Sequence, residues 1–133
     1  MQDESLFVIV SRFNDYINGA DLRGLISMMT DDHTFIDSAG SVVSGKAAAA
    51  AAWDSFFKAF PDYRNVFAQY KVDGPVVLVE GHSICSDARL DGPGLWQATL
   101  REGRIALWRV YEDTIENRRA LGLQSSRDGA SPG

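Results

Sequence analysis

Apolar positions in the first sixty residues recur at the spacing of an α-helix, one stripe for each expected helix. The first helix is expected over 3–20, with its stripe at Leu6, Ile9, Val10, Phe13 and Ile17. The second is expected to begin at Asp21, a residue type that caps helices, with its stripe at Leu22, Leu25, Ile26 and Met29. The third is expected over 45–60, where a run of alanines favours helix and Pro61 ends it.

Between the second and third helices, and again after Pro61, the pattern changes to that of strands. Residues 34–36 and 42–43 favour two short strands around a turn at 38–40. Longer strands are expected at 63–72, 76–90, 95–100 and 104–112, with turns at 73–75, 91–94 and 102–103. Glu102-Gly103 is a strong hairpin signal. Thr114 is expected to cap a last short helix that Gly122 ends.

This order of elements predicts an α+β fold, in which a sheet curled over helices leaves a conical cavity suited to a small ligand. Residues 1–123 are expected to form a single domain. The segment 124–133 is rich in Ser, Gly and Asp and is expected to be a disordered tail.

Composition narrows the classes of partner. The net charge of −5 argues against nucleic acid or an anionic membrane surface. The single cysteine, Cys85, excludes an internal disulfide and a cysteine-rich zinc site. No apolar run approaches the length of a membrane span, and 6–10 is too short for the core of a signal peptide. We therefore expect a cytoplasmic protein with no membrane partner, no metal and no cofactor.

Asp37 is the residue that the pattern singles out for chemistry. It follows the apolar pair Phe35 and Ile36 and stands just before the turn at 38–40, near the mouth of the expected cavity. A carboxylate in such a place is a candidate general base. The alternative is a structural role, in which the side chain accepts hydrogen bonds from the backbone of the turn. Both interpretations stay open at the level of sequence.

The two histidines are weaker candidates. His82 and Glu80 stand two residues apart on an expected strand, so they share a face and would form an acid/base pair if that face lined the cavity. His33, beside Asp31 and Asp32, is expected to be a solvated loop residue. The alternative is an Asp/His metal site, for which the sequence supplies no further ligands.

Several short motifs occur in an order that resembles the nuclear transport factor 2-like superfamily, in particular its SnoaL-like and ketosteroid isomerase-like branch. The likeness covers nearly the whole chain before the tail. The segments that carry it are 12–13, 20–22, 29–37, 45–46, 60–64, 103–105 and 108–113. It implies an α+β barrel, or cone, with three N-terminal helices packed on a curved, mainly antiparallel sheet.

The resemblance places Asp37 where ketosteroid isomerase-like enzymes carry their aspartate base. Their helix-one tyrosine is matched here by Phe13, and their second acid by the strand segment 95–98, which holds no acid. Val110 takes the place of the acid/base aspartate of SnoaL-type cyclases. The epoxide hydrolase triad is replaced by Gly81, Ser83 and Val110.

By the register of the family, Gly81, Ser83 and Cys85 point inward, whereas Glu80 and His82 point outward. Glu112 points to the cavity as a second acid. The expected catalytic residues are therefore Asp37, with Glu112 or His82 as a possible acid. The expected walls of the pocket are Phe13, Tyr16, Phe35, Trp53, Phe57, Ser83, Trp96, Trp108 and Val110.

The superfamily hosts several reactions as well as binding proteins, so fold alone does not choose a function. We expect a cofactor-independent enzyme that isomerises, cyclises or dehydrates a largely apolar, polyketide-, steroid- or terpenoid-like molecule. The alternatives are a non-catalytic module for apolar ligands or dimerisation, and a protein adaptor with an exposed apolar patch. The resemblance also implies a homodimer formed through the outer face of the sheet.

Overall fold

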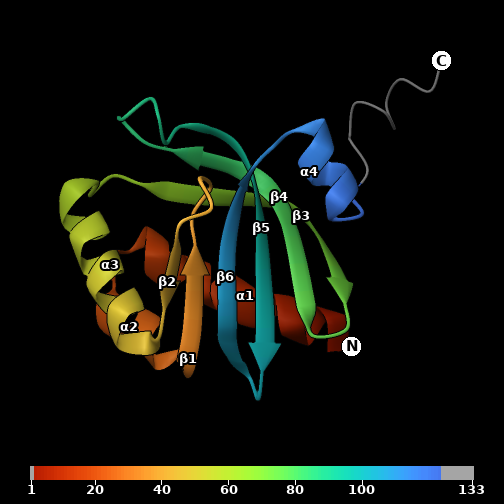
Figure 1. Cartoon of the computed structure of the whole chain (residues 1–133), viewed down its shortest axis with the longest axis horizontal. Coiled ribbons are helices and arrows are strands. Elements are labelled where there is room, and N and C mark those ends of the chain that lie inside the picture. Colours follow the sequence, from red (N-terminus) through yellow and green to blue (C-terminus); the bar gives the residue numbers. More distant parts are fainter. Residues whose placement is uncertain (1, 124–133) are drawn as a thin grey trace.

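A curved six-stranded sheet holds three helices on one face and a fourth on the other (Figure 1). The computed structural model describes residues 2–123. The helices are α1 (Gln2–Asn18), α2 (Leu22–Ser27), α3 (Lys46–Ala59) and α4 (Ile115–Ala120). The strands are β1 (Met29–Ile36), β2 (Val42–Ser44), β3 (Arg64–Asp73), β4 (Val76–Ile84), β5 (Gly92–Arg101) and β6 (Arg104–Glu112). The predicted cone of three N-terminal helices on a curved sheet is confirmed, and the expected tail lies outside the described residues.

The sheet has the strand order β2-β1-β6-β5-β4-β3. All neighbouring strands are antiparallel except β1 and β6, which run parallel and pair Phe35 with Trp108. The prediction of a mainly antiparallel sheet is therefore right. The parallel pair joins an early strand to the last one. The C-terminal ends of β1 and β6 therefore lie at the same end of the sheet.

The second helix is shorter than predicted. Asp21 caps it as expected, since its side chain accepts a hydrogen bond from the Gly24 N–H at 3.0 Å. Met29, however, was expected on the helical stripe and instead begins β1. It is fully buried and pairs with Ile105 of β6. Tertiary pairing therefore overrides the helical period at this residue.

The strand expected over 76–90 ends earlier, and the turn expected at 91–94 is wrong. β4 ends at Ile84, a loop covers 85–91, and β5 already begins at Gly92. Two carboxylates hold the loop: the Cys85 N–H donates to Asp91 Oδ1 at 3.1 Å and the Ser86 N–H donates to Asp62 Oδ2 at 2.9 Å. These carboxylates accept hydrogen bonds from backbone N–H groups that, in a longer strand, would bond to a neighbouring strand.

The main core lies between the three N-terminal helices and the concave face of the sheet. Fully buried side chains meet there from α1, β1, β4, β5 and β6, among them Phe13, Met29, Val79, Trp96 and Trp108. They alternate along each strand with residues of the other face, as the pleat requires. This packing gives the sheet the curvature that keeps a cavity open at one end.

Helix α4 covers part of the convex face. A smaller apolar cluster there joins Leu78 and Leu95 of the sheet to Leu123. Arg118 of α4 forms ion pairs with Glu80 at 2.9 Å and with Asp113 at 2.6 Å. Glu80 therefore lies on the outer face, as the family register predicted.

Within residues 2–123, every helix is too short or too polar to cross a membrane.

Candidate functional site

A cavity of about 140 Å³ lies between α3 and the end of the sheet where β1 and β6 terminate. Most of its wall is apolar, and five of its side chains are aromatic. The lining residues are Phe35, Asp37, Ser38, Ala52, Trp53, Phe56, Tyr63, Leu90, Trp108 and Val110. An apolar cavity of this volume can hold about one aromatic ring.

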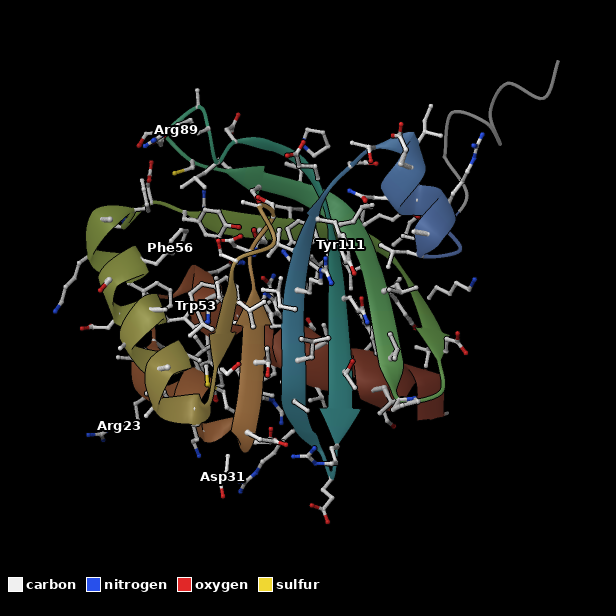
Figure 2. All side chains as sticks on the ribbon, in the orientation of Figure 1. Arg23, Asp31, Trp53, Phe56, Arg89 and Tyr111 are labelled. Atoms are coloured by element: carbon white, nitrogen blue, oxygen red, sulfur yellow. The ribbon has the colours of Figure 1, made fainter. Side chains whose placement is uncertain are left out.

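Trp53 of α3 organises the aromatic wall. Its ring centre lies 5.2 Å from that of Phe35 on β1 and 5.6 Å from that of Phe56, one helical turn further on. Figure 2 shows Trp53 and Phe56 on the side of α3 that faces the sheet. The alanines that precede Trp53 let the helix approach the sheet closely. A wall built from packed rings is rigid and suits a flat apolar ligand.

Asp37 has the structural role that the sequence offered as one alternative, and it also borders the cavity. Its Oδ1 accepts hydrogen bonds from the N–H groups of Ala39 at 2.9 Å and Ser41 at 3.0 Å, so it holds the turn after β1. The same residue lines the cavity. Within residues 2–123, both hydrogen bonds to this carboxylate go to Oδ1, and Oδ2 accepts none. The turn therefore fixes Oδ1 of this carboxylate.

A polar recess of about 120 Å³ adjoins the cavity and shares Ser38, Tyr63, Leu90 and Val110 with it. The recess also reaches Ser83, Trp96 and Glu112. Glu112 is exposed at its outer end and is not a lining residue of the apolar cavity. A ligand that extended from the cavity into the recess would thus pass from aromatic to polar surroundings.

The predicted pocket residues divide into three groups. Four line the cavity: Phe35, Trp53, Trp108 and Val110. Ser83 and Trp96 line the recess.

Phe13, Tyr16 and Phe57 line neither hollow. Phe13 is buried behind the cavity wall, with its ring centre 4.7 Å from that of Trp108. Tyr16 lies over Gly24, where its ring leaves no room for a Cβ atom. Phe57 packs against Trp53 at 5.5 Å. Phe13 and Phe57 therefore pack behind lining residues, whereas Tyr16 packs against α2.

The structure does not bring His82 to Asp37. His82 is exposed on β4, next to the buried Ser83, and lines neither the cavity nor the recess. Its side chain lies on the face opposite to the cavity, which the family register also implied. As a catalytic acid for this cavity, His82 is not supported by its position.

The expectation for His33 is wrong. It is fully buried in β1 rather than solvated in a loop, and its Nδ1 lies 2.7 Å from the carbonyl oxygen of Ile105. Burial holds the pKa of His33 below its ordinary value of 6.5, against the opposing effects of that carbonyl and of Asp32. Because a carbonyl can only accept, Nδ1 carries the proton of the neutral ring.

Five lining residues were not predicted as part of the site, and two of them are aromatic, Phe56 and Tyr63; the others are Ser38, Ala52 and Leu90. Phe56 follows Trp53 by three residues, a spacing that places both on one face of a helix. Tyr63 stands two residues after the helix-ending Pro61 and directly before β3, where the chain enters the sheet beside the cavity. Burial raises the pKa of the Tyr63 phenol, which therefore stays protonated at neutral pH.

A larger depression of about 410 Å³ lies at the other end of the sheet. Its walls are mostly charged: Thr30, Asp31, Asp32, Arg101, Glu102 and Arg104. Asp32 pairs with Arg101, which lowers the pKa of that carboxyl to about 2. Both partners are more than half exposed, so the pair adds little stability. Without an apolar enclosure, this depression lacks the usual features of a small-molecule site.

Comparisons with known proteins place this geometry in context. The sequence pattern of the SnoaL-like domain matches residues 10–108. No curated protein matches the chain.

Solved structures share the fold. A candidate polyketide cyclase from Sinorhizobium meliloti is 24% identical with a TM-score of 0.70, over 77% of this chain and 92% of that chain. A candidate SnoaL-like polyketide cyclase from Jannaschia sp. CCS1 is 20% identical with a TM-score of 0.70, over 92% and 94% of the two chains. An LEH-like epoxide hydrolase from M. tuberculosis is 20% identical with a TM-score of 0.72, over 83% and 79%. At these identities the likeness shows the fold alone.

Proposed function

Because this chain belongs to the SnoaL-like domain family, we propose that it is a cofactor-independent enzyme in which Asp37 moves a proton on an apolar ring compound. The substrate is polyketide-, steroid- or terpenoid-like and carries a carbonyl group. The reaction is an isomerisation, a cyclisation or a dehydration. Each of these begins when a base removes a proton from a carbon next to the carbonyl.

The observation that carries this proposal is the position of the Asp37 carboxylate. It is the one carboxylate among the residues that line the aromatic cavity. Its Oδ1 is held by two backbone N–H groups, at 2.9 and 3.0 Å, so the carboxylate keeps one orientation. A base must lie within about 3 Å of the proton that it removes, and a fixed carboxylate in the cavity wall can meet that requirement.

In the proposed step, Asp37 Oδ2 takes the proton and the electron pair moves toward the carbonyl oxygen as an enolate forms. The protonated carboxyl can return the proton to another carbon, which completes an isomerisation. In a cyclisation the enolate carbon instead attacks a second carbonyl, whose π electrons move to its oxygen, and that oxygen takes the proton back from the Asp37 carboxyl. The aromatic walls, Trp53 and Trp108 among them, hold the ring and exclude water.

A second function, ligand binding without catalysis, is favoured by the positions that hold partner residues in related enzymes. Phe13 and Val110 supply no polar group there. Gly81 cannot carry a side chain, because a Cβ would lie 2.1 Å from the backbone oxygen of Val66. An apolar cavity that keeps Asp37 only as a turn residue would bind ligands and release them unchanged.

An assay of the Asp37→Asn variant with 2-tetralone, a bicyclic ketone with acidic α-protons, distinguishes the two functions. The asparagine Oδ1 still accepts from Ala39 and Ser41, so the turn is kept while the base is lost. We expect exchange of the α-protons for deuterium, followed by NMR in D₂O, to fall roughly 10²–10⁴-fold, as for a general base.

Asp31→Asn is the matched control, since this exposed carboxylate on the same strand lies outside the cavity. It should exchange at the wild-type rate. Binding of 2-tetralone without exchange in the wild-type protein would support the non-catalytic function instead. The cytoplasmic location and the homodimer stay predictions from the sequence.

A further inference from the structure

A chain of hydrogen bonds runs from α1 to the wall of the cavity and ends at the Tyr63 hydroxyl. Asn14 of α1 contacts Asn65 of β3 twice, with Nδ2 3.2 Å from the backbone oxygen and Oδ1 3.1 Å from the side-chain nitrogen. Ser83 Oγ of β4 lies 2.7 Å from Asn65 Oδ1. The Tyr63 hydroxyl lies 3.2 Å from Ser83 Oγ.

The direction of every bond in this chain is set by one backbone carbonyl. The Asn65 carbonyl oxygen can only accept, so the Asn14 atom next to it is the amide nitrogen. Asn14 Oδ1 then faces the second amide, so the Asn65 atom opposite to it is Nδ2. It follows that Asn65 turns its Oδ1 toward Ser83.

Ser83 has one proton, and Asn65 Oδ1 takes it. In its bond to Tyr63, Ser83 Oγ can therefore only accept. The Tyr63 hydroxyl is the donor, and its own proton points back toward Ser83 and away from any ligand. Tyr63 lines both the cavity and the recess, so its lone pairs are the groups that it can offer to a ligand. The Asn65 side chain also lies beside this hydroxyl.

We infer that Tyr63 is a hydrogen-bond acceptor for the ligand, so that the site selects ring compounds carrying a hydroxyl group, such as phenols and enols. This inference deepens the proposed function and rests on the cavity binding a ring compound, as proposed there. Asp37 Oδ2 is a second acceptor in the proposed site. With two acceptors in an aromatic wall, the cavity fits a ligand that brings its own donor.

Two features keep Tyr63 in this role. Burial raises the pKa of its phenol, so the donor proton is retained at neutral pH. The Asn65 backbone carbonyl at the other end of the chain can only accept, so the donors and acceptors along the chain cannot exchange roles. The chain therefore cannot serve as a proton relay. Tyr63 is thus a residue that orients the ligand and determines specificity, and Ser83 is a positioning residue that acts through it.

The test measures binding of three single-ring probes to the whole chain by calorimetry. The probe p-cresol brings a donor, p-xylene has the same shape without one, and 4-methylanisole has an acceptor only. In Tyr63→Phe we expect p-cresol to bind about 3–10-fold more weakly, the worth of one hydrogen bond. The affinities of p-xylene and 4-methylanisole should stay within about twofold.

Tyr70→Phe is the matched control, because it removes the same atom from an exposed tyrosine that lines neither hollow. It should leave all three affinities unchanged. A Tyr63→Phe protein that weakens 4-methylanisole instead would show that Tyr63 donates, and would overturn the inference. An equal loss for p-cresol and p-xylene would overturn it as well.

A comparison on the wild-type protein needs no variant. If Tyr63 accepts from the ligand, p-cresol binds more tightly relative to p-xylene than their transfer from water to hydrocarbon predicts. A ratio equal to the transfer ratio contradicts the inference.

The probes do not react, so the comparison of wild type with Tyr63→Phe does not depend on proton transfer by Asp37. If the wild-type protein exchanges the α-protons of 2-tetralone but shows no preference for p-cresol over p-xylene, only the role of Tyr63 is overturned. If none of the three probes binds, the cavity is no ring site and both proposals fail.

Discussion

His33 places an ionisable ring in the core, where a charge would be costly. The ring packs beside Phe13, with centres 6.0 Å apart, and donates through Nδ1 to Ile105. Its Nε2 is buried without a hydrogen-bond partner in the part of the chain that the structure describes. A second proton would have to enter at that nitrogen. The folded protein therefore holds this ring neutral.

The stability of the protein should fall as the pH drops below the ordinary histidine value of about 6.5. In that range the unfolded chain binds a proton at His33 and the folded chain does not, so the free energy of unfolding decreases by up to about 1.4 kcal/mol per pH unit. His33→Asn keeps a donor for Ile105 and removes the titration. Urea unfolding at several pH values should show a weaker pH dependence for His33→Asn than for wild type.

His82→Asn is the matched substitution at an exposed position, so the effect of burying the ring is the difference between the two variants. Equal slopes for wild type and His33→Asn would contradict the assignment.

At the scale of single residues, the sequence predicted that Asp37 lies at the cavity, and this residue lines it. The prediction that His33 is solvated was wrong. Asp37 stands directly after an apolar pair and before a turn, which are local signals. The burial of His33 has no local signal, because Asp31 and Asp32 make its neighbourhood look solvated. The pairing of β1 with β6 is also irregular between Met29 and Thr34, so a simple two-residue alternation does not describe this strand.

The β5–β6 hairpin is the element that the sequence predicted most directly. Both residues of its turn have positive φ, +53° at Glu102 and +77° at Gly103. This is the backbone of a type I′ turn. Glycine adopts positive φ without steric cost, whereas glutamate is strained there.

Replacing Glu102 by asparagine should stabilise the protein. Asparagine tolerates the left-handed region, so we expect the free energy of unfolding to rise by about 1 kcal/mol, measured by urea unfolding. Glu102→Ala serves as the control, because alanine removes the same charge but keeps the strain. A gain of equal size in both variants would assign the effect to charge. Ligand binding should not change, since the turn lies away from the cavity.

Other element boundaries could not be predicted, for a reason visible in the loop 85–91. Its shape depends on Asp62 and Asp91, whose carboxylates bind the N–H groups of Ser86 and Cys85. Asp62 comes from a different part of the chain. Gly92 and Pro93 are typical of turns, but here they belong to β5 and pair with β4. The local pattern cannot report such distant partners.

On the scale of the whole molecule, α4 is tied to the sheet by one arginine and two acids. The side chains of Arg118, Glu80 and Asp113 are 11%, 16% and 18% exposed, so these charges are largely withdrawn from water. Contact with both carboxylates raises the pKa of Arg118 further above its usual value.

Arg118→Met should destabilise the protein by about 2–3 kcal/mol, because it leaves two partly buried carboxylates without their cation. Urea unfolding measures the loss. Lys58→Met is the control: this lysine pairs with Asp54 but is 76% exposed, so its loss should cost less than about 0.5 kcal/mol. A comparable, small effect in both variants would show that the cluster on α4 contributes no more than a surface pair.

The general architecture was predictable because helices and strands occupy separate stretches of the chain with clear periods. The pairing of β1 with β6 was not, since nothing in either segment indicates which distant strand it will join. The cavity depends on that pairing: Phe35 comes from the first strand and Asp37 directly follows it, and Trp108 and Val110 come from the last. The general place of the cavity and half of its lining residues could be expected from the sequence and the family resemblance, but the other half could not.

The same pairing has a consequence for the order of events during synthesis. The ribosome synthesises β1 long before β6. Until β6 emerges, β1 has only the short β2 as a pairing partner. Contacts between segments so far apart in sequence form late and slow the folding of a domain. The binding cavity is therefore absent from every shorter nascent chain. A small molecule could not act as a folding template before the last strand has docked.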